Sequence, residues 1–206
     1  MFIELTEILR CPNDHPESYL VCVPVAMDGR RVVRGGIGCP VCGAEYPIIG
    51  GVAYFGGSGI GGRGAGGAHR RPPTPDPRPL DADALRAFIN LEGDGGYAVL
   101  AGRLARLGED LAALVPGVRF FGVNPPPGVE PSEAFSVLHS PRGLPVKSAS
   151  VRAVALGEGC ATGPWLAEGA RVLLRGLRFV AENAGVAPDG IAELARGPGL
   201  FVGEKR

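Results

Sequence analysis

Residues 85–124 read LRAFINLEGDGGYAVLAGRLARLGEDLAALVPGVRFFGVN, and this stretch decides the fold. Helix-like and strand-like spacings of apolar residues alternate along it. We expect helices at residues 81–90 and 103–115 and strands at residues 97–101 and 118–123. In the second helix, leucines recur at the spacing of one helix face, at Leu104, Leu107, Leu111 and Leu114. Apolar strands that alternate with amphipathic helices predict an α/β fold, in which helices cover a mainly parallel sheet.

The alternation continues beyond this stretch on both sides. Asp81 is the expected N-cap of the first helix. Further along the chain we expect strands at residues 134–138, 151–156, 177–181 and 200–203, a helix from Pro164 to about residue 174, and a short helix near residues 191–195. Residues 80–206 are therefore predicted to form one α/β domain.

Residues 1–55 form a different zone, because they hold four of the five cysteines and only short β-like runs. We expect a short helix at residues 3–9 and strands at residues 18–25, 31–34 and 52–55. Asp28-Gly29 is a good turn for the first hairpin. This composition predicts a small zinc-ribbon-like α+β module.

Residues 56–79, GGSGIGGRGAGGAHRRPPTPDPRP, separate the two zones. Ile60 is the only aliphatic residue larger than Ala in this stretch, and it holds no aromatic residue. Such a segment cannot bury enough apolar surface to offset its chain entropy. We therefore predict a flexible Gly/Pro linker between a module at residues 1–55 and a domain at residues 80–206, with His69-Arg70-Arg71 as a solvated charge cluster.

The spacing of Cys39 and Cys42 in Cys-Pro-Val-Cys-Gly is that of a zinc knuckle. Two thiolates two residues apart bind one metal ion, and the glycine that follows permits the tight turn. Four protein ligands would close such a site, so it would stabilise the fold and would not catalyse a reaction.

The other half of the metal site is less regular. Cys11 is the expected third ligand and His15 the preferred fourth, because a neutral imidazole is a normal zinc ligand. The usual pattern would have a second Cys at position 14, where Asp14 stands. Asp14 and Cys22 therefore remain alternatives for the fourth position.

The overall composition excludes some classes of function. The 206 residues carry 21 Lys+Arg and 21 Asp+Glu, and this neutrality argues against general nucleic-acid binding. No apolar run is long enough to span a membrane, and the start MFIELTEILRCP is not a secretory signal. We expect a cytoplasmic protein whose thiols stay reduced, which favours metal ligands over disulfides.

The N-terminal zone resembles a known family through LTEILRCP and GCPVCGAEYPIIGGVAYF. These segments are similar to the small zinc-binding activator subunits of tRNA and release-factor methyltransferases and to their short bacterial relatives. The resemblance covers about residues 2–55 and implies a structural zinc ion and docking onto a methyltransferase domain. Asp14 departs from the family pattern, which has a second cysteine at this position.

The second zone resembles a class I methyltransferase. Residues 85–124 follow the rhythm of that family, LPVKSASVRAVAL resembles a later segment, and EGARVLLRGLRFVAEN resembles the one after it. The resemblance covers most of residues 81–206. It implies a Rossmann-like sheet and, in active members, S-adenosylmethionine as cofactor.

The residues that should hold this cofactor are missing. A glycine loop normally follows the first strand, but here Gly102 precedes the larger side chains of Arg103, Leu104 and Arg106, which we expect to fill the nucleoside space. The acid expected at the end of that strand falls on about Leu100. Loss of both features predicts a domain kept for its shape.

Two later positions point the same way. Asn124, followed by three prolines, replaces the acid that would bond the ribose, and Arg152 replaces a further acid. Gly93, Gly95 and Gly96 precede the strand where a nucleotide loop would follow it, so we interpret them as a turn.

Three other residues draw structural interpretations. As a nucleophile, Cys160 would need a nearby histidine, for which His139 is the only plausible candidate, and we expect a buried thiol instead. Glu158 is interpreted as a solvated loop acid, and Trp165 as packing a helix on the sheet.

Together these features predict a non-catalytic, pseudo-methyltransferase scaffold or interaction protein with structural zinc, which binds a protein partner or itself. We do not expect S-adenosylmethionine or a membrane to bind. Two alternatives stay open. One is an active methyltransferase in which Gly102 and Asn124 hold the cofactor. The other is an accessory subunit of a larger complex.

Overall fold

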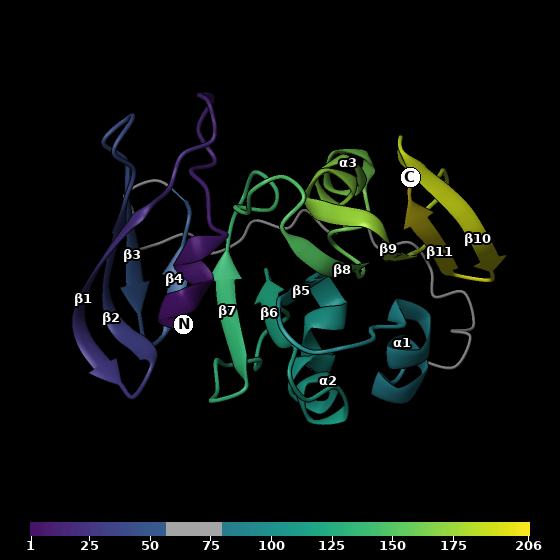
Figure 1. Ribbon diagram of the computed structural model, residues 1–206, viewed down its shortest axis with the longest axis horizontal. Coiled ribbons are helices and arrows are strands. Elements are labelled where there is room, and N and C mark those ends of the chain that lie inside the picture. The colour runs from purple at the N-terminus through teal and green to yellow at the C-terminus, as the bar shows by residue number, and fades with distance from the viewer. Residues whose placement is uncertain (57–79) are drawn as a thin grey trace.

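The computed structural model describes residues 1–56 and 80–206, and these residues form a single sheet of eleven strands. Its order is β1-β2-β3-β4-β7-β6-β5-β8-β9-β11-β10, so both sequence zones contribute to one continuous layer (Figure 1). The strands are β1 (Val21–Asp28), β2 (Arg31–Gly38), β3 (Glu45–Ile49), β4 (Val52–Tyr54), β5 (Tyr97–Ala101), β6 (Arg119–Val123), β7 (Phe135–His139), β8 (Val151–Leu156), β9 (Leu173–Glu182), β10 (Ile191–Gly197) and β11 (Leu200–Lys205).

The helices are short and few. They are η1 (Ile3–Glu7), α1 (Ala82–Ile89), η2 (Gly102–Leu107), α2 (Gly108–Leu114) and α3 (Gly163–Val172). Asp81 caps α1 as predicted, because its side chain accepts a hydrogen bond from the Ala84 amide at 2.8 Å. Within the described residues, no helix is long and apolar enough to cross a membrane.

The C-terminal half has a Rossmann-like topology. Strands β7, β6, β5, β8 and β9 are parallel, and their order is that of a doubly wound sheet read as 3-2-1-4-5. An antiparallel hairpin of β10 and β11 completes this edge against β9. The strand order reverses between β5 and β8, which makes their carboxyl ends the expected ligand position.

The N-terminal zone extends this sheet on the other side. Strands β1 to β4 form an antiparallel meander, and β4 pairs in parallel with β7 through Val52–Val137, Ala53–Leu138 and Tyr54–His139. The two zones of one chain are therefore joined by backbone hydrogen bonds. The prediction of separate parts at residues 1–55 and 80–206 stays a prediction, and the predicted linker at residues 56–79 lies almost wholly outside the described residues.

Each face of the sheet has its own core. Helices α1, η2 and α2 cover one face, where Leu85, Leu104 and Phe120 are fully buried. The opposite face is covered by α3 and by the N-terminal segment that contains η1, with Leu5 and Leu9 buried there. Figure 1 shows η1 beside β4 and β7, between the two halves of the molecule.

The N-terminal segment substitutes for a crossover helix. The connection from β7 to β8, residues 140–150, has no helix, although parallel strands are usually joined by one. Leu9 instead forms an antiparallel bridge with Val146, and the Lys147 amide donates to the Ile8 carbonyl at 2.8 Å. Residues far apart in sequence thus cover the face that a local helix would otherwise cover.

Three predicted elements need correction. The helix near residues 191–195 is wrong, because this segment is strand β10, paired with β11. Pairing across the tight turn at Gly199 outweighs the helix propensity of its Ala, Glu and Leu residues. The helix at residues 103–115 is split into η2 and α2, and the one at residues 3–9 is the 3₁₀ helix η1.

Candidate metal centre and the carboxyl ends of the central strands

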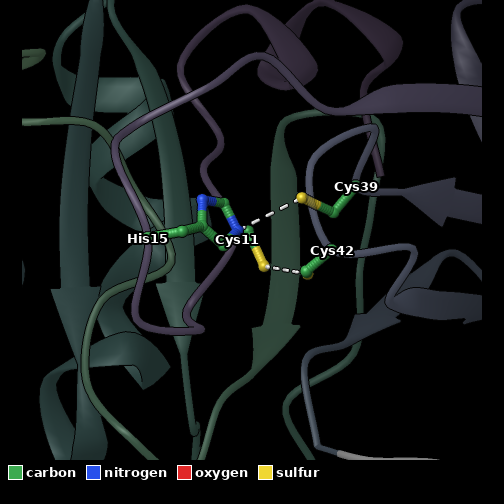
Figure 2. Close-up of side chains that lie close together, drawn as sticks. All are labelled: Cys11, His15, Cys39 and Cys42. Carbon is green, nitrogen blue, oxygen red and sulfur yellow. Dashed lines mark hydrogen bonds between the residues drawn. The ribbon is translucent and has the colours of Figure 1, made fainter.

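The structure brings Cys11, His15, Cys39 and Cys42 together. One ligand atom from each lies within 4.8 Å of the other three (Figure 2). Cys39 and Cys42 lie in the loop between β2 and β3, and Cys11 and His15 lie in the segment after η1. The cluster therefore ties the N-terminal segment to the meander.

Two distances within the cluster are close to those of a tetrahedral metal site. Zinc bonds of about 2.3 Å to sulfur and about 2.0 Å to nitrogen place ligand atoms roughly 3.5–3.8 Å apart in a tetrahedron. The Cys11 and Cys42 sulfurs are 3.7 Å apart, and the Cys39 sulfur is 3.3 Å from Nε2 of His15. Three sulfurs and one imidazole nitrogen at this spacing could hold a metal ion.

Surrounding groups orient these ligands. Nδ1 of His15 lies 2.8 Å from the Pro16 carbonyl, and a proton donated there leaves the lone pair of Nε2 facing the thiolates. The Tyr46 hydroxyl lies 3.0 Å from the Cys11 sulfur, and the Asn13 side-chain amide donates to Cys42 at 3.4 Å. Sequence reasoning gave Tyr46 no role in this site.

Backbone amides favour thiolates in the knuckle. A hydrogen bond from the Ala44 amide is the main cause that lowers the pKa of Cys42 to about 6. For Cys39, burial acts to raise the pKa, but hydrogen bonds from the Cys42 and Val41 amides outweigh it and the pKa is lowered. Burial raises the pKa of Cys11, with the Tyr46 hydrogen bond acting against it. The loop is therefore arranged to stabilise negative sulfur at two of three positions.

The two alternative fourth ligands lie outside this cluster. Asp14 has an exposed side chain, and Cys22 is a half-buried residue of β1. Burial raises the pKa of the Cys22 thiol, as expected for a side chain that packs against the core. His15 is the residue that completes the cluster in the structure.

At the carboxyl ends of β5 and β8, the two loops contact each other through their backbones. Gly102 has φ +60°, and a Cβ there would lie 2.4 Å from the Glu158 carbonyl oxygen. A Cβ on Gly157 would lie 2.5 Å from the Leu104 amide nitrogen, and the Arg103 amide donates to the Glu158 carbonyl at 3.2 Å. Both glycines are needed for this close approach, which brings the two loops together where a Rossmann-like fold would bind its ligand.

An ion pair between half-buried Arg103 and buried Glu182 closes the same region. The Arg103 guanidinium donates two hydrogen bonds to Glu182, at 2.6 Å and 3.2 Å, and the Glu158 amide donates a third at 2.9 Å. Only 3% of Glu182 is exposed. Leu104 is buried in the core of this face, whereas Arg106 is exposed and bonds the Leu80 carbonyl, so Arg106 does not fill the space as expected.

Asn124 is engaged at both ends of its side-chain amide. It donates to the Ser140 carbonyl at 2.6 Å and accepts from the Ser140 amide at 2.9 Å. Its backbone has φ +51°, a conformation that Asn tolerates better than most residues. These bonds fix the crossing from β6 to the loop after β7.

The other candidates have structural roles. Arg152 donates to the carbonyls of Glu92, Gly93 and Gly95, so the glycine segment is a turn before β5, as predicted. Cys160 is 3% exposed, and burial raises its pKa to about 11, which makes it a poor nucleophile. The His139 ring stacks on Tyr54, with 5.2 Å between ring centroids.

We expect Gly102→Ala to destabilise the protein by about 2–3 kcal/mol, because it adds a methyl group at positive φ and against the Glu158 carbonyl. Gly50→Ala is the matched control, since Gly50 also has φ +60° but no atom within 4 Å of a new Cβ. Chemical denaturation of both variants would separate backbone strain from the contact. Equal losses in the two variants would contradict the close approach.

No family model and no curated protein sequence matches the chain. Among solved structures, it is similar to the antibiotic-resistance methyltransferase Kmr, with 13% identity, 61% of this chain and 93% of that chain covered, and a TM-score of 0.40. It is also similar to a chain of the Haloferax volcanii complex of the Trm112 methyltransferase activator and a putative methyltransferase, with 25% identity, coverages of 48% and 50%, and a TM-score of 0.37.

A third similar structure is geranyl diphosphate methyltransferase in complex with SAM, with 20% identity, coverages of 48% and 46%, and a TM-score of 0.40. The chain therefore spans most of the first of these structures and about half of the other two. These neighbours are methyltransferase folds.

Proposed function

We propose that this protein is a non-catalytic scaffold or interaction protein, a pseudo-methyltransferase whose N-terminal module is stabilised by a structural zinc ion. The observation that carries the proposal is the backbone contact between the loops after β5 and β8. Gly102 and Leu104 lie against residues 157 and 158 where an adenosine would have to enter. The Arg103–Glu182 pair holds the same loops together.

The residues that would hold the cofactor in an active enzyme are already used. Asn124 bonds Ser140 with both ends of its amide, and Gly102 packs on the Glu158 carbonyl. To bind S-adenosylmethionine, the protein would have to break these contacts and the buried ion pair. Such a rearrangement costs free energy that binding would have to supply.

The Cys/His cluster supports the zinc part of the proposal. Cys11, His15, Cys39 and Cys42 supply four ligand atoms within 4.8 Å of one another, with hydrogen bonds that orient His15 and Cys11. With four protein ligands no position is open to a substrate, so the ion would supply folding free energy. It would hold the N-terminal segment on the sheet.

Calorimetric titration of the metal-containing protein with S-adenosylmethionine tests the proposal. We expect no saturable heat in the micromolar range, and the same result with S-adenosylhomocysteine. Micromolar binding of either compound would overturn the pseudoenzyme assignment. In that case, loss of binding in Asn124→Ala would identify Asn124 as a cofactor residue and favour the active methyltransferase.

A further inference from the structure

Strands β1 to β3 present an exposed apolar face. The side chains that line up on β1 are well exposed, at 55% for Val21 and 61% for Val23, and Ile49 of β3 is 48% exposed. Val23 pairs with Gly36, and Gly36 pairs with Pro47, so these three residues lie in one row on the same side. We call this surface the meander face.

The meander face continues the side of the sheet that α1 and α2 cover elsewhere. Ile49 is directly opposite Val52 in the register of β3 and β4, and Val52 packs against the core beneath these helices. Residues opposite each other in paired strands share a face of the sheet. Figure 1 shows α1 and α2 below the C-terminal half, far from β1 and β2. The helices of the described residues therefore leave this end uncovered.

Two glycines form a groove along the middle of the meander face. A Cβ on Gly36 would meet no atom within 4 Å, and one on Gly38 would meet only the Val21 carbonyl at 4.0 Å. Neither glycine has a positive φ, so neither the backbone nor the packing of this chain requires it. Glycine inside a strand is destabilising and often marks the close approach of another backbone.

The edge of β1 is poorly suited to hydrogen bonding with a strand of another molecule. Pro24 lacks an amide donor, and β-bulges interrupt the β1–β2 register near Val25. Both features discourage the addition of a further strand at an edge. A partner is therefore better accommodated on the meander face.

The face is complementary to itself. Valines 21 and 23 of β1 form a ridge, and Gly36 and Gly38 of β2 form the adjoining groove. When two copies lie face to face with β1 of each over β2 of the other, each ridge enters the other's groove. This reciprocity is what a two-fold interface requires. The row through Val23, Gly36 and Pro47 contains no charge, whereas the next row, through Val21 and Gly38, ends at the exposed carboxylate of Glu45.

The size of the face suits a weak dimer. Three strands of this length, with about 3.3 Å per residue and about 4.8 Å between strands, present roughly 350 Å². Two such areas fall below the ~1,200–2,000 Å² of stable complexes, in the range of transient ones. Residues 57–79 offer only Ile60 as a large apolar side chain, so that segment is a poor occupant by its composition.

We propose that the meander face is the interface of a two-fold dimer of this protein, with the β1 valines packed into the β2 glycine groove of the second copy. This proposal rests on the packing of β1 to β3 alone. It holds or fails separately from the cofactor and the metal.

Sedimentation velocity on the full chain at increasing concentration tests the dimer. We expect the wild-type protein to associate to a dimer in the micromolar range. Val23→Lys should abolish the dimer, because it would place a charge in the groove. Gly36→Val should weaken it at least tenfold but raise the midpoint of thermal unfolding, because valine suits a strand and would fill the groove.

Val186→Lys is the matched control, since Val186 is 75% exposed and lies next to a separate cavity beside α3. It should sediment as the wild type does. Equal metal content and unchanged thermal unfolding would show that Val23→Lys is folded. A wild-type protein that stays monomeric at all concentrations would overturn the proposal, and this is the result expected if a different protein covers the face. A dimer that persists in Val23→Lys would also overturn it.

Discussion

Cys39→Ser is expected to abolish metal binding and to lower the stability of the whole chain by several kcal/mol. Cys39 is 3% exposed, its sulfur lies 3.3 Å from Nε2 of His15, and its pKa is lowered by backbone amides. Structural zinc in small modules contributes about 10–16 kcal/mol of apparent binding free energy, which becomes folding free energy. Loss of one of four ligands should remove a large part of it.

The effect should spread beyond the module. The metal cluster anchors the segment that carries Leu5 and Leu9, and both leucines are buried on the sheet face shared with α3. Release of this segment would expose that face over β5 to β7. We therefore expect one cooperative thermal transition at a lower temperature, not the loss of residues 1–55 alone.

Metal analysis of the purified protein, with thermal denaturation, provides the measurement. The wild type should carry one zinc ion per chain, and chelation should reproduce the loss of stability. Cys22→Ser is the control, because Cys22 is a half-buried thiol outside the cluster and should leave the metal content unchanged. A Cys39→Ser protein with full zinc and the wild-type midpoint would refute the metal centre.

Local patterns predicted much of this fold. The apolar runs of β5 and β8 end where they were expected, and Asp81 begins α1, because burial on both faces and capping are local signals. The apolar pattern alone did not predict β3, and it predicted a helix where β10 stands. Their residues take strand conformation because of partners in the sheet, and no local pattern encodes those partners.

The candidate sites also contain some features that the sequence predicted and others that only the structure shows. The spacing of Cys39 and Cys42 is visible in the sequence, and it led to Cys11 and His15. Glu182 was missed because its partner Arg103 lies 79 residues away and neither residue belongs to a motif. In the sequence, Gly102 is followed by larger residues, which suggested that their side chains fill the space of the nucleoside. The structure adds that the backbones of the two loops already meet there.

Arg103→Met is the second variant with a large expected effect. It would leave Glu182, whose side chain is 4% exposed, with the Glu158 amide as its remaining hydrogen-bond donor among those described above. Removal of one partner from a buried ion pair costs about 3–5 kcal/mol, and we expect a loss at the lower end of this range, because Glu182 stays buried with one amide donor. For a chain of this size the midpoint of thermal unfolding should fall by on the order of 10 °C.

The double variant Arg103→Met/Glu182→Leu separates this cost from lost packing. It removes both charges, so it should recover much of the stability, since apolar replacements of a buried pair are often neutral. A double-mutant cycle from thermal and denaturant unfolding gives the coupling between the two residues. Additive losses in the double variant would contradict a buried, coupled pair.

The same variants distinguish two ways in which the nucleoside space could be closed. If the Arg103 side chain alone excluded the cofactor, Arg103→Met would bind S-adenosylmethionine. We expect it not to bind, because the Gly102 and Leu104 backbone still lies against residues 157 and 158 without the ion pair. Micromolar binding in this variant but not in the wild type would show that a single ion pair keeps a working pocket shut.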